Sequence, residues 1–180
     1  MRNLIILLLT LFIATTVFGQ SKDDEKAIDN IVQEMAEGWS NADGAIFAKH
    51  FAEEHDYFVW NGLYHKNMSK EQNAYGHQSL FDKEYKNTTH YAVLDKVRFI
   101  TENVAVALVT AAVVSKGESM PEHPQVLWSG TLLKENGIWK IVSFHNADIE
   151  ILDNAVSRAN SPIPIESMYK KWYDTYNQLQ

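Results

Sequence analysis

The chain has 180 residues, a formal net charge of −7 at pH 7 and no cysteine. An acidic chain without basic runs argues against a nucleic-acid partner. A chain without cysteine forms no disulfides, so its hydrophobic core must stabilise the fold alone. The length suits one domain with a substantial core.

Residues 1–19 have the pattern of a secretory signal peptide. Arg2 precedes an uninterrupted apolar run, and small residues then lead to a polar segment that begins at Gln20. We expect cleavage after Gly19 and export to the periplasm or the medium of a bacterium. The alternative is an N-terminal membrane anchor, for which the apolar run is short. After cleavage we expect no association with the membrane.

Helical periodicity dominates the next stretch of sequence. From Asp23 to Ser40, apolar residues recur on one face at helical spacing, and acidic residues occupy the first turn. The sequence breaks at 41–44, where Asp43 is placed to cap a second helix over Ala45 to Phe51.

A short hairpin and a third helix are expected next. Tyr57 to Trp60 is typical of a strand, Asn61-Gly62 of a turn, and Tyr64-His65 of the start of a partner strand. Ser69 and Gln72 then fit a capping box, which opens a helix that runs to about Tyr85.

From Thr88 the periodicity becomes strand-like. Strands are predicted over His90 to Thr101 and over Val104 to Ser115, followed by a polar loop, Lys116 to Pro124, and a hairpin over 125–148. Helices first and four long antiparallel strands last indicate an α+β fold, with the helices on one face of a curved sheet.

Asn136-Gly137, in the middle of the last hairpin, is a strong turn signal. A three-residue turn with a bulge at Gly137 sets Trp128 against Phe144. A two-residue type I′ turn is favoured instead, and both registers stay open. Counting back from the two-residue turn gives the pairs Glu135–Ile138, Leu132–Ile141, Gly130–Ser143 and Trp128–His145.

The C-terminal end has a different pattern. Regular periodicity lapses after residue 150 and returns in an amphipathic helix, Glu166 to Leu179. This helix is expected to lie across its own domain, to close a pocket or to pair with another subunit. We divide the chain into a signal peptide, an α+β domain and a C-terminal extension, with the bounds 1–19, 20–150 and 151–180.

Five short motifs follow one another in a recognisable order. They are Trp39-Ser-Asn-Ala-Asp43, Phe51-Ala-Glu-Glu-His-Asp56-Tyr-Phe-Val59, Gly62, Asn136-Gly-Ile-Trp139-Lys-Ile141 and His145-Asn146. Together they resemble the pattern of SgcJ/EcaC-type proteins, which belong to the SnoaL-like part of the nuclear transport factor 2-like superfamily. The resemblance covers residues 24–150.

This resemblance implies a cone-like, cystatin-like α+β fold. Helices then pack on the concave face of a strongly bent antiparallel sheet and leave a pocket at its open end. The resemblance also implies a homodimer formed through the outer face of the sheet. It does not settle the function, because the superfamily contains isomerases, cyclases, dehydratases and non-catalytic modules.

His145 is the candidate catalytic residue, because imidazole is the usual general base near neutral pH. Its alternative role is a hydrogen bond within the fold. No metal-ligand spacing, phosphate loop or nucleophile elbow occurs, so we expect neither a metal nor a cofactor. Candidate pocket residues, several of which also suit an ordinary core, are Trp39, Tyr57, Trp60, Asn61, Tyr91, Trp128 and Asn146.

The sequence thus predicts an exported domain that binds a small, mostly apolar molecule in a cone pocket. If the domain is an enzyme, we expect cofactor-free isomerase, cyclase or dehydratase chemistry, with His145 as base and Asn61 or Asn146 as polar helper. The alternative is a non-catalytic dimerisation or assembly module, whose contacts come from the outer sheet face and the last helix.

Overall fold

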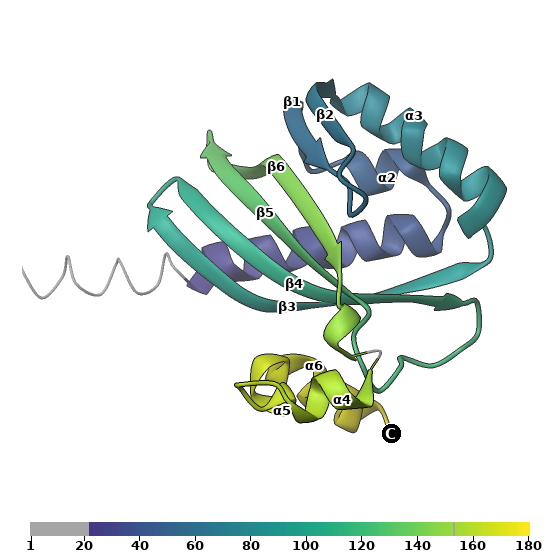
Figure 1. The fold of residues 1–180 in the computed structure, drawn as a ribbon. Helices are drawn as coiled ribbons and strands as arrows, with labels where there is room; N and C mark the ends of the chain where they lie inside the picture. The colour runs from purple at the N-terminus through teal and green to yellow at the C-terminus, as the bar shows by residue number, and fades with distance from the viewer. Residues whose placement is uncertain (1–21, 153) are drawn as a thin grey trace, which may run out of the picture.

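A computed structural model describes residues 22–152 and 154–180, so the predicted signal peptide lies outside the described residues. Figure 1 shows a curved sheet with the N-terminal helix, α2 and α3 on one side and the C-terminal helices on the other. In this part of the chain, no helix combines the length and the apolarity needed to cross a membrane.

Six strands form one sheet in the order β2-β1-β6-β5-β4-β3. β1 and β6 pair in parallel, and all other neighbours are antiparallel. The expected α+β architecture is therefore confirmed. The strands are β1 Phe51–Phe58, β2 Tyr64–Ser69, β3 Thr88–Thr101, β4 Val104–Ser115, β5 Val126–Glu135 and β6 Ile138–Asp148.

Three helices lie on the concave face of the sheet. The N-terminal helix covers residues 22–40 and matches its prediction. α2, Gly44–Ala48, is capped by Asp43, whose Oδ1 accepts a hydrogen bond from the Ile46 amide. The predicted extension of this helix to Phe51 is wrong, because Phe51 is fully buried and pairs with β6 as the first residue of β1.

The third helix begins as the sequence predicts. Ser69 and Gln72 form both hydrogen bonds of the capping box at the start of α3, Lys70–Leu80. The chain continues as a π-helical turn, η1, over Phe81–Tyr85. Gly44 lets α2 approach α3 closely, because a Cβ at this position would lie 2.2 Å from the Ala74 carbonyl oxygen.

The β5–β6 hairpin has the two-residue turn that the sequence favours. Asn136 and Gly137 have φ values of 52° and 81°, and Glu135 pairs with Ile138. Leu132 pairs with Ile141, as predicted. The register then shifts, because Val142 is an extra residue on β6 that opposes no residue of β5.

This bulge makes the rest of the predicted register wrong. Gly130 pairs with Phe144 rather than Ser143, and Trp128 pairs with Asn146 rather than His145 or Phe144. Because successive residues point to opposite faces, one extra residue exchanges the inward and outward sets of β6.

The main core lies between the sheet and the N-terminal helix. Small residues on the inner face of β4, Ala105, Ala107 and Ala111, are almost fully buried there. β4 is apolar on both faces, as its sequence indicates, because its outer face is also covered: Ala112 packs in a second cluster with Trp172 of the C-terminal extension.

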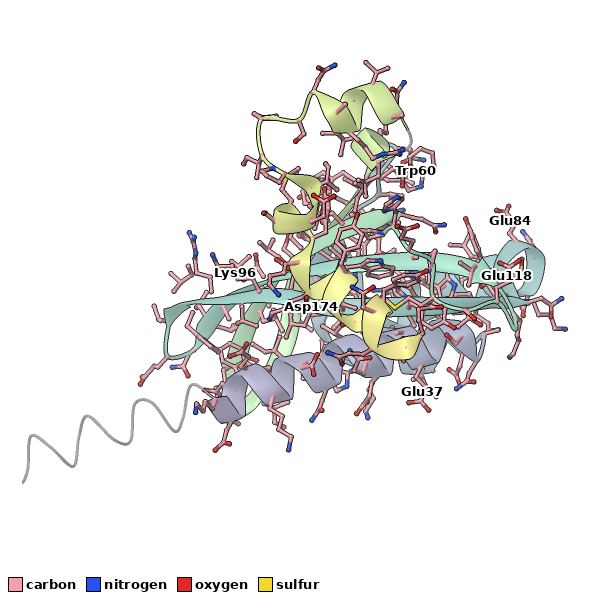
Figure 2. The ribbon with its side chains drawn as sticks, turned by 90° about the horizontal axis from the view of Figure 1, so that it is seen from below. Glu37, Trp60, Glu84, Lys96, Glu118 and Asp174 are labelled. Carbon is pink, nitrogen blue, oxygen red and sulfur yellow. The ribbon has the colours of Figure 1, made fainter. Side chains whose placement is uncertain are left out.

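The C-terminal extension packs on its own domain (Figure 2). Its last helix, predicted as one element, is split at Tyr169 into α5, Ile165–Met168, and α6, Lys170–Leu179. Two further short elements precede it: η2, Glu150–Leu152, and α4, Ala155–Ala159. Trp172 is fully buried against β3 and β4, which fixes α6 on the outer side of the sheet.

A buried ion pair joins the first turn of the N-terminal helix to the β5–β6 hairpin. Asp24 Oδ1 accepts hydrogen bonds from Lys134 Nζ at 2.6 Å and from Trp139 Nε1 at 2.9 Å. Both donors lose their acceptor if the carboxylate is removed, and a largely buried ammonium group is then left without its counter-charge.

We therefore expect Asp24→Ala to lower the free energy of unfolding by about 3 kcal/mol. Urea denaturation followed by circular dichroism measures this change. Asp23→Ala is the matched control, because Asp23 is exposed in the same helical turn. Equal stability of the two variants would contradict the structural role of the pair.

Candidate functional site

β1 and α3 place polar side chains inside the otherwise aromatic interior. His55 Nδ1 lies 3.0 Å from the Ala52 carbonyl oxygen, which can only accept, so Nδ1 carries the proton. His55 Nε2 is then an acceptor and receives a hydrogen bond from Asn73 Nδ2 at 2.9 Å. Both side chains are buried, so this bond connects the strand to the helix in the interior.

His77, one helical turn beyond Asn73, is bound in the same way. Its Nδ1 donates to the Asn73 carbonyl oxygen at 3.0 Å, and its Nε2 accepts from the Tyr57 hydroxyl at 3.3 Å. Burial lowers the pKa of His77 to about 4, against the opposing effect of the Asn73 carbonyl and with a smaller contribution from His55. Burial also raises the pKa of Tyr57 well above its ordinary value. Both groups are thus neutral at pH 7.

Trp39 and His90 form the other end of this interior. Trp39 Nε1 donates to Thr88 Oγ1 at 3.0 Å, and Ser40 Oγ accepts from the His90 amide at 2.9 Å. These bonds fasten the end of the N-terminal helix to the start of β3. The rings of Trp39 and His90 lie 5.3 Å apart, and burial lowers the pKa of His90 to about 4.

The β5–β6 hairpin supplies the remaining wall. Trp128 and Phe144 are buried with their ring centres 5.2 Å apart, and Phe144 stacks on Tyr57 at 4.7 Å. Asn146 pairs with Trp128 and so shares its face of the sheet. Aromatic and imidazole rings therefore form a continuous series from Trp128 to His90.

Three buried polar atoms along this series lack a hydrogen-bond partner among the described residues: Asn73 Oδ1, His90 Nδ1 and Asn146 Oδ1. The two amide oxygens can only accept, and a neutral imidazole nitrogen can accept as well. Buried polar groups normally find a partner, so such atoms mark positions where a water or a ligand group completes the site.

The structure brings together four of the predicted pocket residues and separates the others. Trp39, Tyr57, Trp128 and Asn146 all belong to the interior just described. Trp60 is 61% exposed, and the Asn61 side chain accepts from the Leu63 amide within the exposed β1–β2 turn. Tyr91 lies on the outer face, where its hydroxyl donates to the Glu118 carbonyl oxygen at 2.9 Å.

His145 also lies away from the interior. It is exposed on the outer face, pairs with Ser129, and its ring lies 5.9 Å from that of Phe58. The bulge at Val142 is the physical reason, because it turns Phe144 and Asn146 inward and His145 outward. The expected juxtaposition of Trp128 and His145 is therefore wrong, and a role for His145 as base has no support from its surroundings.

Sequence reasoning missed four interior residues: His55, Asn73, His77 and His90. A signal for two of them was present, because Asn73, His77 and Phe81 are spaced by four and form the buried stripe of α3 and η1. The apolar residues of this segment predict a stripe of Ala74, Leu80, Phe81 and Tyr85, in which Phe81 is buried but Leu80 is 41% exposed. In residues 22–152 and 154–180, no three His, Asp or Glu residues are arranged to hold a metal ion.

No protein-family model matches this sequence, and no curated protein sequence does either. Solved structures do match. A protein of unknown function with a cystatin-like fold, from Nostoc punctiforme, is 24% identical with a TM-score of 0.63, over 87% of this chain and 96% of that chain.

Some of the matching structures are named as enzymes. A scytalone dehydratase-like protein from Novosphingobium aromaticivorans is 12% identical with a TM-score of 0.61, over 73% of this chain and 87% of that chain. A hexachlorocyclohexane dehydrochlorinase from Novosphingobium barchaimii is 12% identical with a TM-score of 0.55, over 72% and 89%.

The fold is cystatin-like. It is shared with proteins of the nuclear transport factor 2-like group, as the sequence motifs indicate. Identities this low establish the fold alone, because one fold carries many functions. The narrower SgcJ/EcaC assignment stays a prediction.

The buried histidines make stability depend on pH. The pKa values of His77 and His90 fall from 6.5 to about 4 on folding, so the unfolded chain binds more protons between these values. The contribution of the two neutral histidines to the stability of the folded protein is complete above pH 6.5 and is lost as the pH falls toward about 4. Stability should therefore drop by about 2 kcal/mol per histidine between about pH 7.5 and about pH 5.

Urea denaturation at the two pH values tests this expectation. His90→Phe removes one titrating group and one unpartnered nitrogen, so this variant should lose less stability on acidification than the unaltered protein. An equal loss of stability on acidification in the two proteins would contradict the lowered pKa of His90.

Proposed function

We propose that the interior between the helices and the concave face of the sheet binds a small, mostly apolar molecule that carries hydrogen-bond donors. The supporting observation is the set of three buried, unpartnered atoms on Asn73, His90 and Asn146, which lies along a series of aromatic rings. Sites for small molecules typically combine apolar walls with a few placed polar groups.

The polarity of these atoms narrows the class of ligand. A molecule that offers only acceptors leaves both amide oxygens unsatisfied, whereas a hydroxyl or amine group completes them. The walls Trp39, Tyr57 and Trp128 favour a flat apolar body. We therefore propose a hydroxylated or aminated aromatic or alicyclic compound as the ligand.

Cofactor-free proton transfer is a second candidate function, and the state of His90 favours it. His77 Nε2 is already engaged by the Tyr57 hydroxyl, but His90 Nδ1 is neutral, buried and without a partner among the described residues. His90 is thus the interior group able to accept a proton from a bound molecule. The enzymes named among the solved structures of this fold, a dehydratase-like protein and a dehydrochlorinase, are consistent with this chemistry.

Export and dimerisation belong to the same proposal. Export rests on the sequence pattern of residues 1–19. Dimerisation rests on the outer sheet face, where Leu108 and Val106 of β4 pair with Lys96 and Arg98 of β3 and line a groove of about 320 Å³ with them. Strand pairing places the aromatic pair Phe58–Tyr64 and the carboxylate of Asp56 at the opposite end of this face.

Two copies related by a two-fold axis can place Lys96 and Arg98 of one copy toward Asp56 and the Phe58–Tyr64 pair of the other. The non-catalytic assembly function would use the same contacts without a ligand.

Ligand binding is tested with 2-naphthol and naphthalene, which differ by one hydroxyl group. We expect tryptophan fluorescence titration to show tighter binding of 2-naphthol by about fivefold, because its hydroxyl donates to an interior acceptor. Asn146→Leu should reduce this difference while the far-UV circular dichroism spectrum stays unchanged.

The neighbouring residue supplies the control for this experiment. His145→Leu changes an adjacent position whose side chain points outward, so it should leave both affinities unchanged. An interior site would be contradicted if neither compound bound, or if Asn146→Leu and His145→Leu lowered the affinity for 2-naphthol equally.

The dimer is tested by analytical ultracentrifugation. Arg98→Glu reverses a charge on the outer face and should convert the dimer to a monomer at micromolar concentration. Lys83→Glu makes the same charge change at an exposed position of η1, away from this face, and should leave the dimer intact. A monomeric unaltered protein would refute this part of the proposal.

A further inference from the structure

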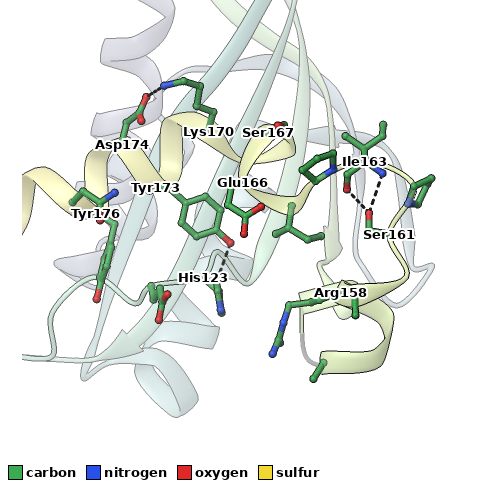
Figure 3. A pocket seen from close by; sticks show the side chains of 17 residues that line it. His123, Arg158, Ser161, Ile163, Glu166, Ser167, Lys170, Tyr173, Asp174 and Tyr176 are labelled. Carbon is green, nitrogen blue, oxygen red and sulfur yellow. Dashed lines mark hydrogen bonds and ion pairs between the residues drawn. The ribbon is translucent and has the colours of Figure 1, made fainter.

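A cleft of about 1080 Å³ lies outside the cone, between the C-terminal extension and the loop that joins β4 to β5 (Figure 3). Its walls come from α4, α5 and α6, the connecting residues 161–164, and loop residues 122–123. Its size is that of a ligand site, which is on the order of 300–1,000 Å³.

The frame of the cleft is held by buried contacts. Trp172 is fully buried, and its Nε1 donates to the carbonyl oxygens of Pro121 at 3.2 Å and Glu122 at 3.1 Å. Asn154 caps α4 by accepting from two backbone amides. Trp172 thus fixes α6 against the loop, and the cap orders the first turn of α4.

Polar side chains converge on this cleft. The Tyr173 hydroxyl and His123 Nδ1 form a hydrogen bond of 2.9 Å across its inner end. Arg158 Nη1 donates to the Leu152 carbonyl oxygen, which orients the guanidinium group, and the other donors of this group make no hydrogen bond to a described residue. Figure 3 shows the side chains of Glu166, Tyr173, His123 and Arg158 turned toward the same opening.

Both signs of charge surround the Tyr173 hydroxyl. Burial raises the pKa of Tyr173, the carboxylates of Glu166 and Glu122 raise it further, and the guanidinium group of Arg158 acts in the opposite direction. None of the five ion pairs between described residues involves Arg158, Glu122 or Glu166. In contrast, Lys170 at the rim pairs with Asp174.

We propose that the cleft binds a zwitterion, with its carboxylate on Arg158 and its ammonium group near Glu122 and Glu166. The planar fork of arginine matches a carboxylate, and the two glutamates match a cation. Tyr173, Tyr176 and Ile163 also line the cleft and provide apolar surface.

The ligand chemistry is that of an α-amino acid or of a short peptide with free ends. The volume of the cleft is larger than a single amino acid needs and suits a short peptide. This inference does not rest on the proposed function, because no residue of the cone interior takes part in it.

Isothermal titration calorimetry with the peptide Ala-Phe-Ala tests the proposal on the purified protein. We expect the peptide with free ends to bind, and its N-acetylated and C-amidated forms to bind at least about tenfold more weakly, because each lacks one charged group. Free phenylalanine distinguishes the two classes of ligand. If it binds as tightly as the peptide, the ligand is a free amino acid; if it binds more weakly, the ligand is a peptide.

Variants assign each end of the ligand to its partner. Arg158→Gln should bind the free and the C-amidated peptides equally, and the double variant Glu122→Gln, Glu166→Gln should bind the free and the N-acetylated peptides equally. Lys170→Gln is the control, because this lysine lines the cleft with its charge already paired, and it should keep the affinity within about twofold.

Arg158→Lys guards against loss of the extension's structure. This variant keeps the positive charge but lacks the planar fork. Its difference in affinity between the free and amidated peptides should be smaller than that of the unaltered protein and larger than that of Arg158→Gln. Near-UV circular dichroism, to which the buried Trp172 contributes, checks that each variant is folded. No binding of the free peptide below about 10 mM, or equal binding of the blocked peptides by the unaltered protein, would overturn the proposal.

Discussion

The single extra residue at Val142 determines which residues at the end of β6 face the interior. Before the bulge, Ile141 and Trp139 pack into the core; beyond it, Phe144 and Asn146 take the inward positions. Without it, the inward and outward sets beyond Val142 would be exchanged. The inward positions of Phe144 and Asn146 and the outward positions of Ser143 and His145 all depend on this one irregularity. The neighbouring strand β1 follows the same division, since its residue Tyr57 pairs with Phe144.

The interior combines two requirements that usually conflict. It is dominated by rings that exclude water, yet it contains histidine and asparagine side chains whose burial is costly unless they are hydrogen-bonded. The structure resolves part of this conflict by keeping His55 and His77 neutral and by giving each ring nitrogen a partner. His90 and Asn146 are not satisfied in this way. An interior that gives most of its polar groups a partner and leaves a few without one is better suited to recognising a molecule than to stabilising a core.

Local signals in the sequence were sufficient for most of the fold. The capping residues Asp43 and Ser69, the turn at Asn136-Gly137 and the uninterrupted apolar β4 act over a few residues, so their outcome does not depend on distant parts of the chain. The bulge at Val142 has no glycine or proline to announce it, and β1 is rich in charged residues because only part of its length is buried. The candidate site depended on these two features, which explains why Trp128 was placed correctly in the interior and His145 was not. His90 could not be recognised as an interior residue, because its burial comes from the distant Trp39.

The parallel pairing of β1 with β6 has a consequence for the order in which the molecule assembles. Phe51 of β1 pairs with Ile141 of β6, so this contact closes a loop that contains β2, α3 and the three strands β3 to β5. Closing a long loop is entropically unfavourable until other contacts have formed, and contacts distant in sequence slow folding. The antiparallel strands β3 to β6 are joined by short connections and can associate first. During synthesis from the N-terminus, β1, β2 and α3 emerge early but must wait for the last strand of the sheet before they can dock, and until then their aromatic residues stay exposed to chaperones and to aggregation.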